Sequence, residues 1–380
     1  MNIASAWGRR GGRLVAGIGL LALLAGCASS EKPRPVELGV NPALVAPTLA
    51  WTTRIGDIGF ALDARVTAGV ITLAGSEGVV AAIDGASGRD LWRTQLAEPI
   101  VAGVGSDGRF SAVLSKANEL IVLDGGKEIW RAALGALGTT APLVAGGRVF
   151  VLTADRSVSA FDAMGGRKLW TYARPGDQSL VLSQLGVLLA VGETLVAGNA
   201  GRLIGLSPDD GSLRWEAPIA TARGTNDIER LVELVGRASR EGPVVCARSF
   251  QSAVGCVNTV RGTTVWSKPA SGAQGLAGDA QLLFGTEGNG RVMAWKRENG
   301  EMAWSSDRLK YRGLSAPLSL DFAVVVGDAQ GWVHFLSRAD GAPLGRVSTD
   351  GSAIAAAPVL VGNTLVVLTQ KGGIFGFRPD

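Results

Sequence analysis

Short apolar runs of five or six residues alternate along the chain with turns rich in glycine and aspartate. The clearest stretch has two such runs at 140–145 and 148–153, joined by a Gly-Gly pair that suits a two-residue hairpin turn. Two more runs follow at 157–162 and 167–172. No long segment carries apolar residues three and four apart, the spacing of an amphipathic helix. The pattern therefore predicts four antiparallel strands in this stretch.

The second half of this stretch, SVSAFDAMGGRKLW at 157–170, is one copy of a repeat. Related copies occupy 78–92, 118–130, 201–215, 252–266, 290–304 and 331–345, and an eighth begins at 373. The tryptophans that end six copies stand at 92, 130, 170, 215, 266 and 304, so successive copies are 38, 40, 45, 51 and 38 residues apart. This is the period of a four-stranded propeller blade.

The ends of the chain suggest how such a ring would close. First strands of the other blades are expected near 60–66, 99–104, 185–190, 231–236, 273–277, 315–319 and 355–360. The last copy has only three strands, whereas an isolated run at 49–54 contains Trp51, 41 residues before Trp92. Setting this run beside 373–378 leaves no open edge. The sequence predicts an all-β fold, an eight-bladed β-propeller of four-stranded antiparallel blades closed by an N-terminal strand that completes the last blade.

The residues that recur in each copy invite two interpretations. The tryptophans are candidates for stacking on a ligand, but their recurrence favours packing between neighbouring blades. Asp84, Asp124 and Asp162 are candidates for acid or metal chemistry, but their place at turns favours hydrogen bonds to nearby backbone amides. We therefore expect both sets to belong to the frame.

The first residues indicate export. Three arginines precede an apolar run at 14–26, which is too short to cross a bilayer, as in a signal peptide. Leu24, Ala25, Gly26 and Cys27 resemble a bacterial lipobox, in which lipid is attached to Cys27; an ordinary signal peptide with an incidental cysteine is the alternative. We expect a signal peptide at 1–26, the lipidated Cys27 with a flexible tether at 27–47, and the propeller at 48–380.

Residue usage narrows the chemistry. The formal charge of +4 becomes +1 once the three arginines of the signal peptide are removed, and no basic stripe suggests nucleic acid. With one histidine and three cysteines, the chain cannot build a metal site rich in those residues, and we expect no metal and no cofactor. His334 is interpreted as a packed or hydrogen-bonded core residue. Cys246 and Cys256 face each other across a predicted hairpin, either as a disulfide or as buried thiols.

The segment AIDGASGRDLW at 82–92 is similar to the repeat of the quinoprotein-type propellers. Together with the lipobox and the tether, the chain resembles the BamB family of outer-membrane lipoproteins over nearly its whole length. This resemblance implies a non-enzymatic adaptor at the periplasmic side of the outer membrane, anchored there by its lipid. It also implies docking on the POTRA domains of BamA within the BAM complex, with nascent outer-membrane proteins as clients.

Two connections between blades are longer than the rest, at 173–184 and 218–230, and both flank blade four. Long ordered loops in compact domains are usually functional, so we expect the partner to bind here. The resemblance places a Leu-x-Leu-Arg motif in the first loop and acidic residues after the second, although Ser183 replaces the arginine and Val235 replaces one acid. The expected partner-binding residues are Leu180, Leu182, Ser183, Asn226, Asp227, Glu229, Arg230 and Glu233.

Two other functions share the repeat. A quinone-cofactor (PQQ-type) dehydrogenase would need a bound Ca²⁺, a catalytic aspartate and usually an adjacent Cys-Cys pair, and the sequence has no such pair. Its repeated acids would radiate around the ring instead of converging on one ion. A saccharide-binding propeller would need several aromatic residues on one rim, and the chain has two tyrosines and mostly repeat-bound tryptophans. We expect no catalytic residues.

Overall fold

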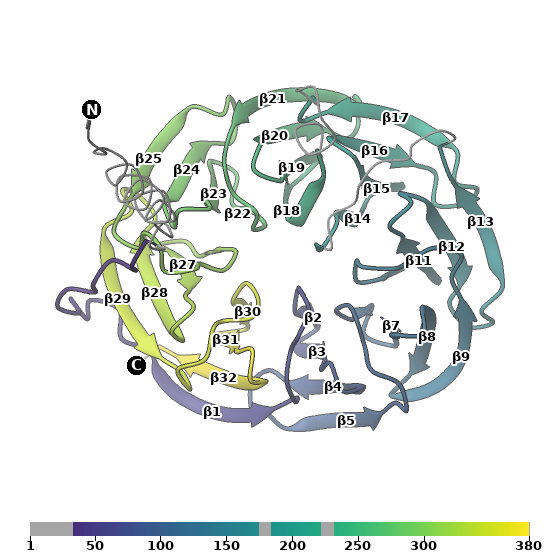
Figure 1. Ribbon diagram of the computed structural model, residues 1–380, viewed down its shortest axis with the longest axis horizontal. Coiled ribbons are helices and arrows are strands. Elements are labelled where there is room, and N and C mark those ends of the chain that lie inside the picture. The colour runs from purple at the N-terminus through teal and green to yellow at the C-terminus, as the bar shows by residue number, and fades with distance from the viewer. Residues whose placement is uncertain (1–32, 175–183, 222–231, 380) are drawn as a thin grey trace, which may run out of the picture. The chain divides into compact units, whose positions relative to one another are not determined.

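The computed structural model describes residues 33–174, 184–221 and 232–379. Residues 35–380 form one compact unit, to which the description below refers. Eight four-stranded antiparallel sheets are arranged around a common centre, as Figure 1 shows, so the predicted eight-bladed β-propeller is confirmed. No helix within the described residues is long and apolar enough to span a membrane.

The blades follow one another in chain order. Blade one contains β2 (Arg65–Thr67), β3 (Val70–Ala74), β4 (Val79–Asp84) and β5 (Asp90–Gln95), and blade two β6 (Gly105–Ser106), β7 (Phe110–Leu114), β8 (Glu119–Asp124) and β9 (Lys127–Ala133). Blade three contains β10 (Leu143–Ala145), β11 (Arg148–Leu152), β12 (Val158–Asp162) and β13 (Lys168–Tyr172), and blade four β14 (Leu188–Val191), β15 (Thr194–Asn199), β16 (Arg202–Leu206) and β17 (Leu213–Pro218). Blade five contains β18 (Leu234–Glu241), β19 (Val244–Ser249), β20 (Ala253–Asn258) and β21 (Thr263–Pro269), and blade six β22 (Ala277–Gly278), β23 (Leu282–Thr286), β24 (Val292–Lys296) and β25 (Met302–Ser306). Blade seven contains β26 (Leu318–Ser319), β27 (Ala323–Gly327), β28 (Trp332–Ser337) and β29 (Pro343–Ser348), and blade eight β30 (Val359–Val361), β31 (Thr364–Leu368), β32 (Gly373–Arg378) and β1 (Thr48–Arg54).

Burial explains the hydrophobic pattern of each strand. The second strands, such as β7 and β31, are buried at every position, because a neighbouring blade covers each of their faces. The outer strands alternate, as in β9, because one face of these strands meets solvent. The core is therefore distributed between the blades and is not gathered at one centre.

The N-terminal strand closes the ring as predicted. β1 pairs with β32 over the whole length of both strands, from Thr48 opposite Arg378 to Arg54 opposite Gly373. Blade eight thus takes its outer strand from the start of the chain and its other three from the end. No edge of this blade is left unpaired at the seam.

The predicted first strands were placed too early. β6 and β22 have only two residues each, and the prediction at 99–104 does not overlap β6 at all. Residues before these strands make single bonds instead of ladders: Val101 donates its N–H to the Leu114 carbonyl at 3.0 Å, and Ile100 forms an isolated bridge. Apolar residues precede each first strand because they line the centre of the ring. In the sequence, such an apolar run cannot be distinguished from a buried strand.

The tryptophans pack between blades as interpreted. Each indole lies against a glycine in the last turn of the following blade, and a methyl group added there would come within 3.0 Å of the ring. The pairs are Trp51 with Gly88, Trp92 with Gly126, Trp130 with Gly166, Trp170 with Gly211, Trp215 with Gly262, Trp266 with Gly300 and Trp304 with Gly341. Four of the indoles also donate N–H to a carbonyl of the next blade at 2.7–3.0 Å. Glycine is required there because indole occupies the space of a side chain.

The interpretation of the recurrent aspartates holds for two of the three. Asp84 accepts the N–H of Ser87 at 2.7 Å, and Asp162 accepts that of Gly165 at 2.6 Å. For Asp124 the prediction was wrong, since its carboxylate forms an ion pair with Arg109 at 2.8 Å. The turn of blade two has only two residues between its strands, which leaves no amide in position for the carboxylate.

Residues 35–47, named here the N-terminal arm, are not a free tether. The Val36 N–H bonds to the Lys310 carbonyl at 3.0 Å, and Asn41 exchanges two 3.2 Å hydrogen bonds with the backbone of Arg346. Leu38 packs against the core between blades six and seven, and Val45 packs against the core between blades seven and eight. The prediction of a structureless tether is wrong for this part of 27–47. Composition alone does not reveal that the propeller has a surface on which these residues pack.

The arm occupies a place that a tryptophan fills elsewhere. Blade seven has Gly345 at this position, and the Val45 carbonyl oxygen would be 2.1 Å from a Cβ added there. The N–H groups of Leu44 and Val45 both bond to the Leu344 carbonyl, at 2.8 and 3.1 Å. A tryptophan here would have no turn to pack on, because the last turn of blade eight is replaced by the two chain ends.

Candidate docking face around blade four

Most of the expected partner-binding residues lie outside the described part of the chain. Leu180, Leu182 and Ser183 fall in 175–183, and Asn226, Asp227, Glu229 and Arg230 fall in 222–231. Of the eight, Glu233 is described. The neighbouring residues nevertheless define where these two segments begin and end.

The downstream ends of the two segments lie side by side. Gly186 forms a bridge with Val235, and the Gly236 N–H bonds to the Leu185 carbonyl at 2.6 Å. A third blade joins them, because the hydroxyl of Thr140 accepts the Gly186 N–H at 2.9 Å. The described residues that follow the two segments, at 185–186 and 235–236, are therefore bonded to one another.

Glu233 belongs to an ion pair that is largely removed from solvent. Its carboxylate accepts the Nε–H of Arg156 at 3.0 Å, and a terminal nitrogen of the same guanidinium is also bonded to it. The side chains of Arg156 and Glu233 are only 8% and 13% exposed. This contact links the turn between β11 and β12 to the start of blade five. The carboxylate of Glu233 thus fixes the frame of the face, in addition to any role toward a partner.

Arg156 was not predicted, although the sequence carries a signal for it. Its φ is 61°, and the corresponding turns of other blades place Gly78, Asn118, Gly290 or Gly331 in the same left-handed region. An arginine is costly in this conformation, so its presence in the third copy indicates a specific contact. Comparison of the repeats at this position would have identified it.

On the outer side, a hollow of about 740 Å³ lies between blades four and five. Thr221 and Val232, the residues on either side of the second segment, line it together with Phe250 and Lys268. On β17 of blade four, Arg174 and Arg202 both reach the carboxylate of Glu216, at 3.0 and 3.1 Å. The hollow has both polar and apolar walls, which is common in protein-binding surfaces.

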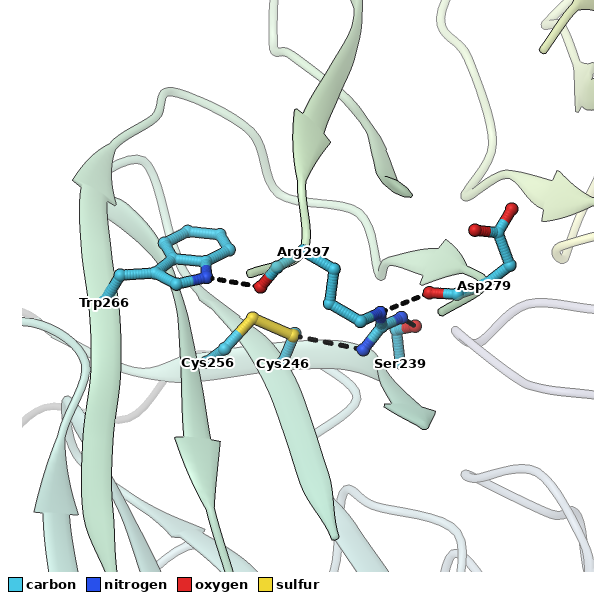
Figure 2. The surroundings of a disulfide bond; sticks show 6 residues. All are labelled: Ser239, Cys246, Cys256, Trp266, Asp279 and Arg297. Atoms are coloured by element: carbon cyan, nitrogen blue, oxygen red, sulfur yellow. Dashed lines mark hydrogen bonds between the residues drawn. A yellow bond between two sulfur atoms is a disulfide. The ribbon is translucent and has the colours of Figure 1, made fainter. Parts of the chain in front are cut away.

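The structure joins Cys246 and Cys256 in a disulfide between directly opposed residues of β19 and β20. Figure 2 shows it beneath Arg297, whose guanidinium donates to the sulfur of Cys246 at 3.3 Å, while the Arg297 carbonyl accepts the indole N–H of Trp266 at 2.7 Å. Both cysteines are fully buried, and burial lowers the pKa of Arg297. The bond belongs to the core between blades five and six.

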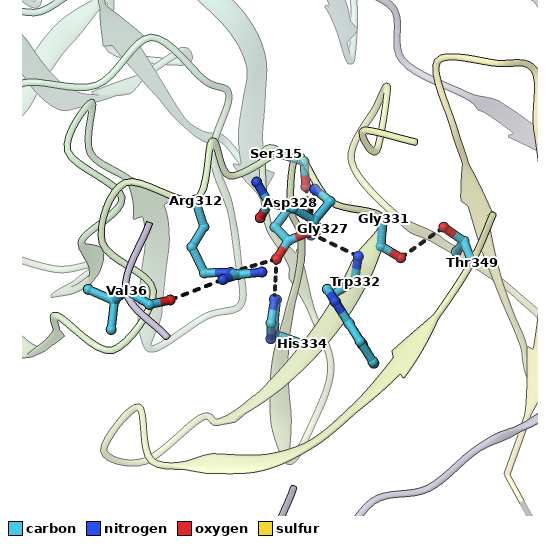
Figure 3. A network of polar contacts seen from close by, with 10 residues as sticks. Val36, Arg312, Ser315, Gly327, Asp328, Gly331, Trp332, His334 and Thr349 are labelled. Atoms are coloured by element: carbon cyan, nitrogen blue, oxygen red, sulfur yellow. Dashed lines mark hydrogen bonds and ion pairs between the residues drawn. The ribbon is translucent and has the colours of Figure 1, made fainter. Parts of the chain in front are cut away.

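His334 is a hydrogen-bonded core residue, as interpreted. Its Nε2 lies 2.9 Å from the Asp328 carboxylate, which also accepts Arg312 at 2.7 Å and the Trp332 N–H at 3.0 Å (Figure 3). Arg312 in turn donates to the Val36 carbonyl at 3.0 Å. The network therefore ties the N-terminal arm to blade seven. Among the described residues no three His, Cys, Asp or Glu side chains gather as a metal site would require.

Comparison with known proteins identifies the family. Residues 76–306 match the family model described as outer membrane protein assembly factor BamB. A BamB protein of Burkholderia pseudomallei is 37% identical over 362 residues, which cover 94% of this chain and 95% of that protein. The chain belongs to the BamB family. The family resemblance stated from the sequence is thereby confirmed.

Solved structures agree with the fold. BamB from Moraxella catarrhalis superimposes with a TM-score of 0.77 at 25% identity and covers 88% of this chain and 100% of that one. A quinohemoprotein alcohol dehydrogenase from Comamonas testosteroni reaches a TM-score of 0.66 at 16% identity, covering 90% of this chain and 78% of the enzyme. That second likeness shows the shared propeller alone.

Proposed function

We propose that the chain is a non-enzymatic scaffold in the assembly of outer-membrane β-barrel proteins. Membership of the BamB family over nearly the full length carries this proposal, because the matched relatives are named outer membrane protein assembly factors. The repeated residues add support, because the tryptophans pack between blades and two of the aspartates stabilise turns. The fold therefore accounts for these residues without a catalytic role. The location that accords with this function is the periplasmic side of the outer membrane.

The finer proposal concerns the anchor and the partner. Lipid on Cys27 would hold the propeller at the membrane, and the segments flanking blade four would dock on the POTRA domains of a BamA-like partner. Two observations support this docking face: the residues that follow the two segments are bonded to each other, and a hollow with polar and apolar walls lies beside the second segment. Leu180 and Leu182 are proposed as apolar anchors, since a few such side chains commonly dominate binding.

A binding assay tests the docking face. The mature chain, residues 27–380, is captured on the immobilised periplasmic domains of the partner. Leu180→Asp combined with Leu182→Asp should reduce binding at least tenfold, about 1.4 kcal/mol. The control is Leu91→Asp, which places the same charge at an exposed leucine (57%) of blade one. Unchanged binding in the double variant, with its circular dichroism intact, would refute the assignment.

A further inference from the structure

The centre of the ring is a channel made of two cavities that meet. The larger, of about 1110 Å³, is lined by Gln184 and Leu185, next to the first of the two long segments. The smaller, of about 490 Å³, is lined at its far end by Leu189 and Leu360. Asp63, Leu185, Gly236 and Arg237 line both, so these residues mark the junction.

Charged side chains from opposite sides of the ring lie at or beside this junction: Asp63 and Arg237 line both cavities, and Arg65 lines the smaller one. Asp63 and Arg65 belong to blade one, and Arg237 belongs to β18 of blade five. Figure 1 shows β2 and β18 facing each other across the centre. Burial raises the pKa of Asp63, while the positive charges of Arg237 and Arg65 oppose that rise, so both guanidiniums act on this carboxylate.

The backbone is shaped to deliver Arg237. The pairing of β18 with β19 is interrupted between Val235 and Ser239, and Gly236 has a φ of 73°. A Cβ on Gly236 would come 2.5 Å from the Gly275 backbone, so only glycine fits. The Arg237 carbonyl is held by the Leu276 N–H of blade six at 2.8 Å. A bulge of this kind re-aims a side chain, and here it points one into the channel.

These two arginines differ from the buried arginines of the same protein. Arg248 pairs with Glu287 at 3.0 Å and Arg312 with Asp328 at 2.7 Å. In the described residues, by contrast, Arg65 and Arg237 make no hydrogen bond or ion pair. Two guanidiniums facing one carboxylate leave a net charge of +1 with free donors. Arg237 is exposed and Asp63 and Arg65 are half-buried, so an ion in the channel can reach all three side chains. Guanidinium groups bind carboxylate and phosphate oxygens in a planar, two-bond geometry.

We propose that the junction binds one small oxyanion, a phosphate or a carboxylate, between the guanidiniums of Arg65 and Arg237. The anion enters through the larger cavity, whose volume is sufficient for a small-molecule ligand. Asp63 limits affinity by repulsion and orients the two arginines. This site goes beyond partner docking, because its charged residues, Asp63, Arg65 and Arg237, are not among the expected partner-binding residues.

Isothermal titration calorimetry on the full chain in detergent tests the proposal. Inorganic phosphate and acetate are titrated separately, with chloride adjusted to keep the ionic strength constant. One saturable site is expected for at least one of the anions. Arg237→Gln and Arg65→Gln should each weaken binding about tenfold or more. Arg109→Gln, which removes an exposed arginine on the outer surface, should leave binding unchanged.

Asp63→Asn supplies the sharper outcome, because removing the repelling charge should strengthen binding by about threefold or more. A gain of affinity cannot come from damage to the fold, so this variant decides the matter even when an arginine variant is unstable. The proposal is overturned when neither anion shows saturable heat, or when Asp63→Asn and both arginine variants bind as the unmodified chain does.

Discussion

Replacing Gly345 with alanine tests whether the N-terminal arm is part of the propeller. The new Cβ would lie 2.1 Å from the carbonyl oxygen of Val45, far inside van der Waals contact. Pairing with Phe335 of β28 holds Gly345 in place, so β29 resists moving away from this clash. The arm therefore has to leave its place.

The arm's contacts limit the size of the effect. Two backbone hydrogen bonds, from Leu44 and Val45 to the Leu344 carbonyl, each contribute about 1 kcal/mol net. Half-burial of the Val45 side chain adds about 1 kcal/mol. A released arm regains conformational freedom, which offsets part of this sum of about 3 kcal/mol. We expect the free energy of unfolding to fall by about 1–2 kcal/mol.

Hydrogen exchange followed by mass spectrometry reports on the arm directly. Peptides from 35–47 should lose protection in Gly345→Ala while the blades keep theirs, and urea unfolding should give the loss of stability. Gly135→Ala is the matched control, because a Cβ there has no atom within 4 Å. That control should be neutral or slightly more stable, as the unfolded chain loses freedom. Retained protection of the arm in Gly345→Ala would show that the arm does not depend on this glycine.

Three further predictions concern ion pairs and the disulfide. Arg156→Met removes the cation of a pair only 8% and 13% exposed, and should lower the free energy of unfolding by about 3 kcal/mol in urea. Burial favours a raised pKa for Asp279, but hydrogen bonds from Arg338 and the backbone hold it at about 2. The stability that ionised Asp279 contributes is therefore present above about pH 4 and is lost as the pH falls toward 2. This loss is about 1 kcal/mol after solvent screening. In Asp279→Asn it should disappear when the free energy of unfolding is measured over this pH range. Reducing the bond between Cys246 and Cys256 should lower stability by about 3 kcal/mol, checked by thiol titration alongside urea unfolding.

Controls separate these effects from general damage. Arg109→Met breaks an exposed pair with Asp124, and should cost under about 1 kcal/mol. An equal loss in Arg109→Met and Arg156→Met would contradict the role given to burial. Asp209→Asn removes a carboxylate that is 74% exposed and should keep the acid-induced loss intact. In a double variant with alanine at 246 and 256, reductant should have no further effect on unfolding.

The frame could be predicted because its causes repeat. Seven of the eight blades place an indole against a glycine of the next blade, so the tryptophans and glycines recur at nearly the same period. The run at 49–54 was assignable to blade eight because Trp51 kept that period. A contact that recurs from blade to blade requires the same residue type in each copy of the repeat, so it can be recognised in the sequence.

The first strands could not be placed because two different causes produce the same apolar run. Residues near the centre of the ring are apolar whether they form a ladder or only line the channel. In blade two, Val101 makes a single bond to the second strand, and the ladder begins only at Gly105. Hydrophobic pattern alone does not distinguish a lining residue from a paired one.

The contacts made only once were the hardest to predict. The segment 28–47 was interpreted from its four prolines as a tether, yet the absence of a tryptophan at Gly345 was the sign that something else fills that space. Arg156 stood in a turn where most other copies place glycine or asparagine, although blades four and five have Ala200 and Gln251 there, and its partner Glu233 lies 77 positions away. Such pairs require the fold before they can be recognised.

These departures from the repeat have different purposes. Glycine stands in place of tryptophan at position 345 because the chain ends replace the turn of blade eight on which an indole would pack. This departure therefore results from the closure of the ring. Closure of the ring does not explain Arg156 or the bulge that carries Arg237. Blades three and five are intact and would form equally well with the residues that other blades have at these positions. Both lie beside the two segments that lengthen the period around blade four. Since a left-handed arginine and an interrupted ladder each cost stability, their grouping there favours selection for a function of this face and of the channel below it.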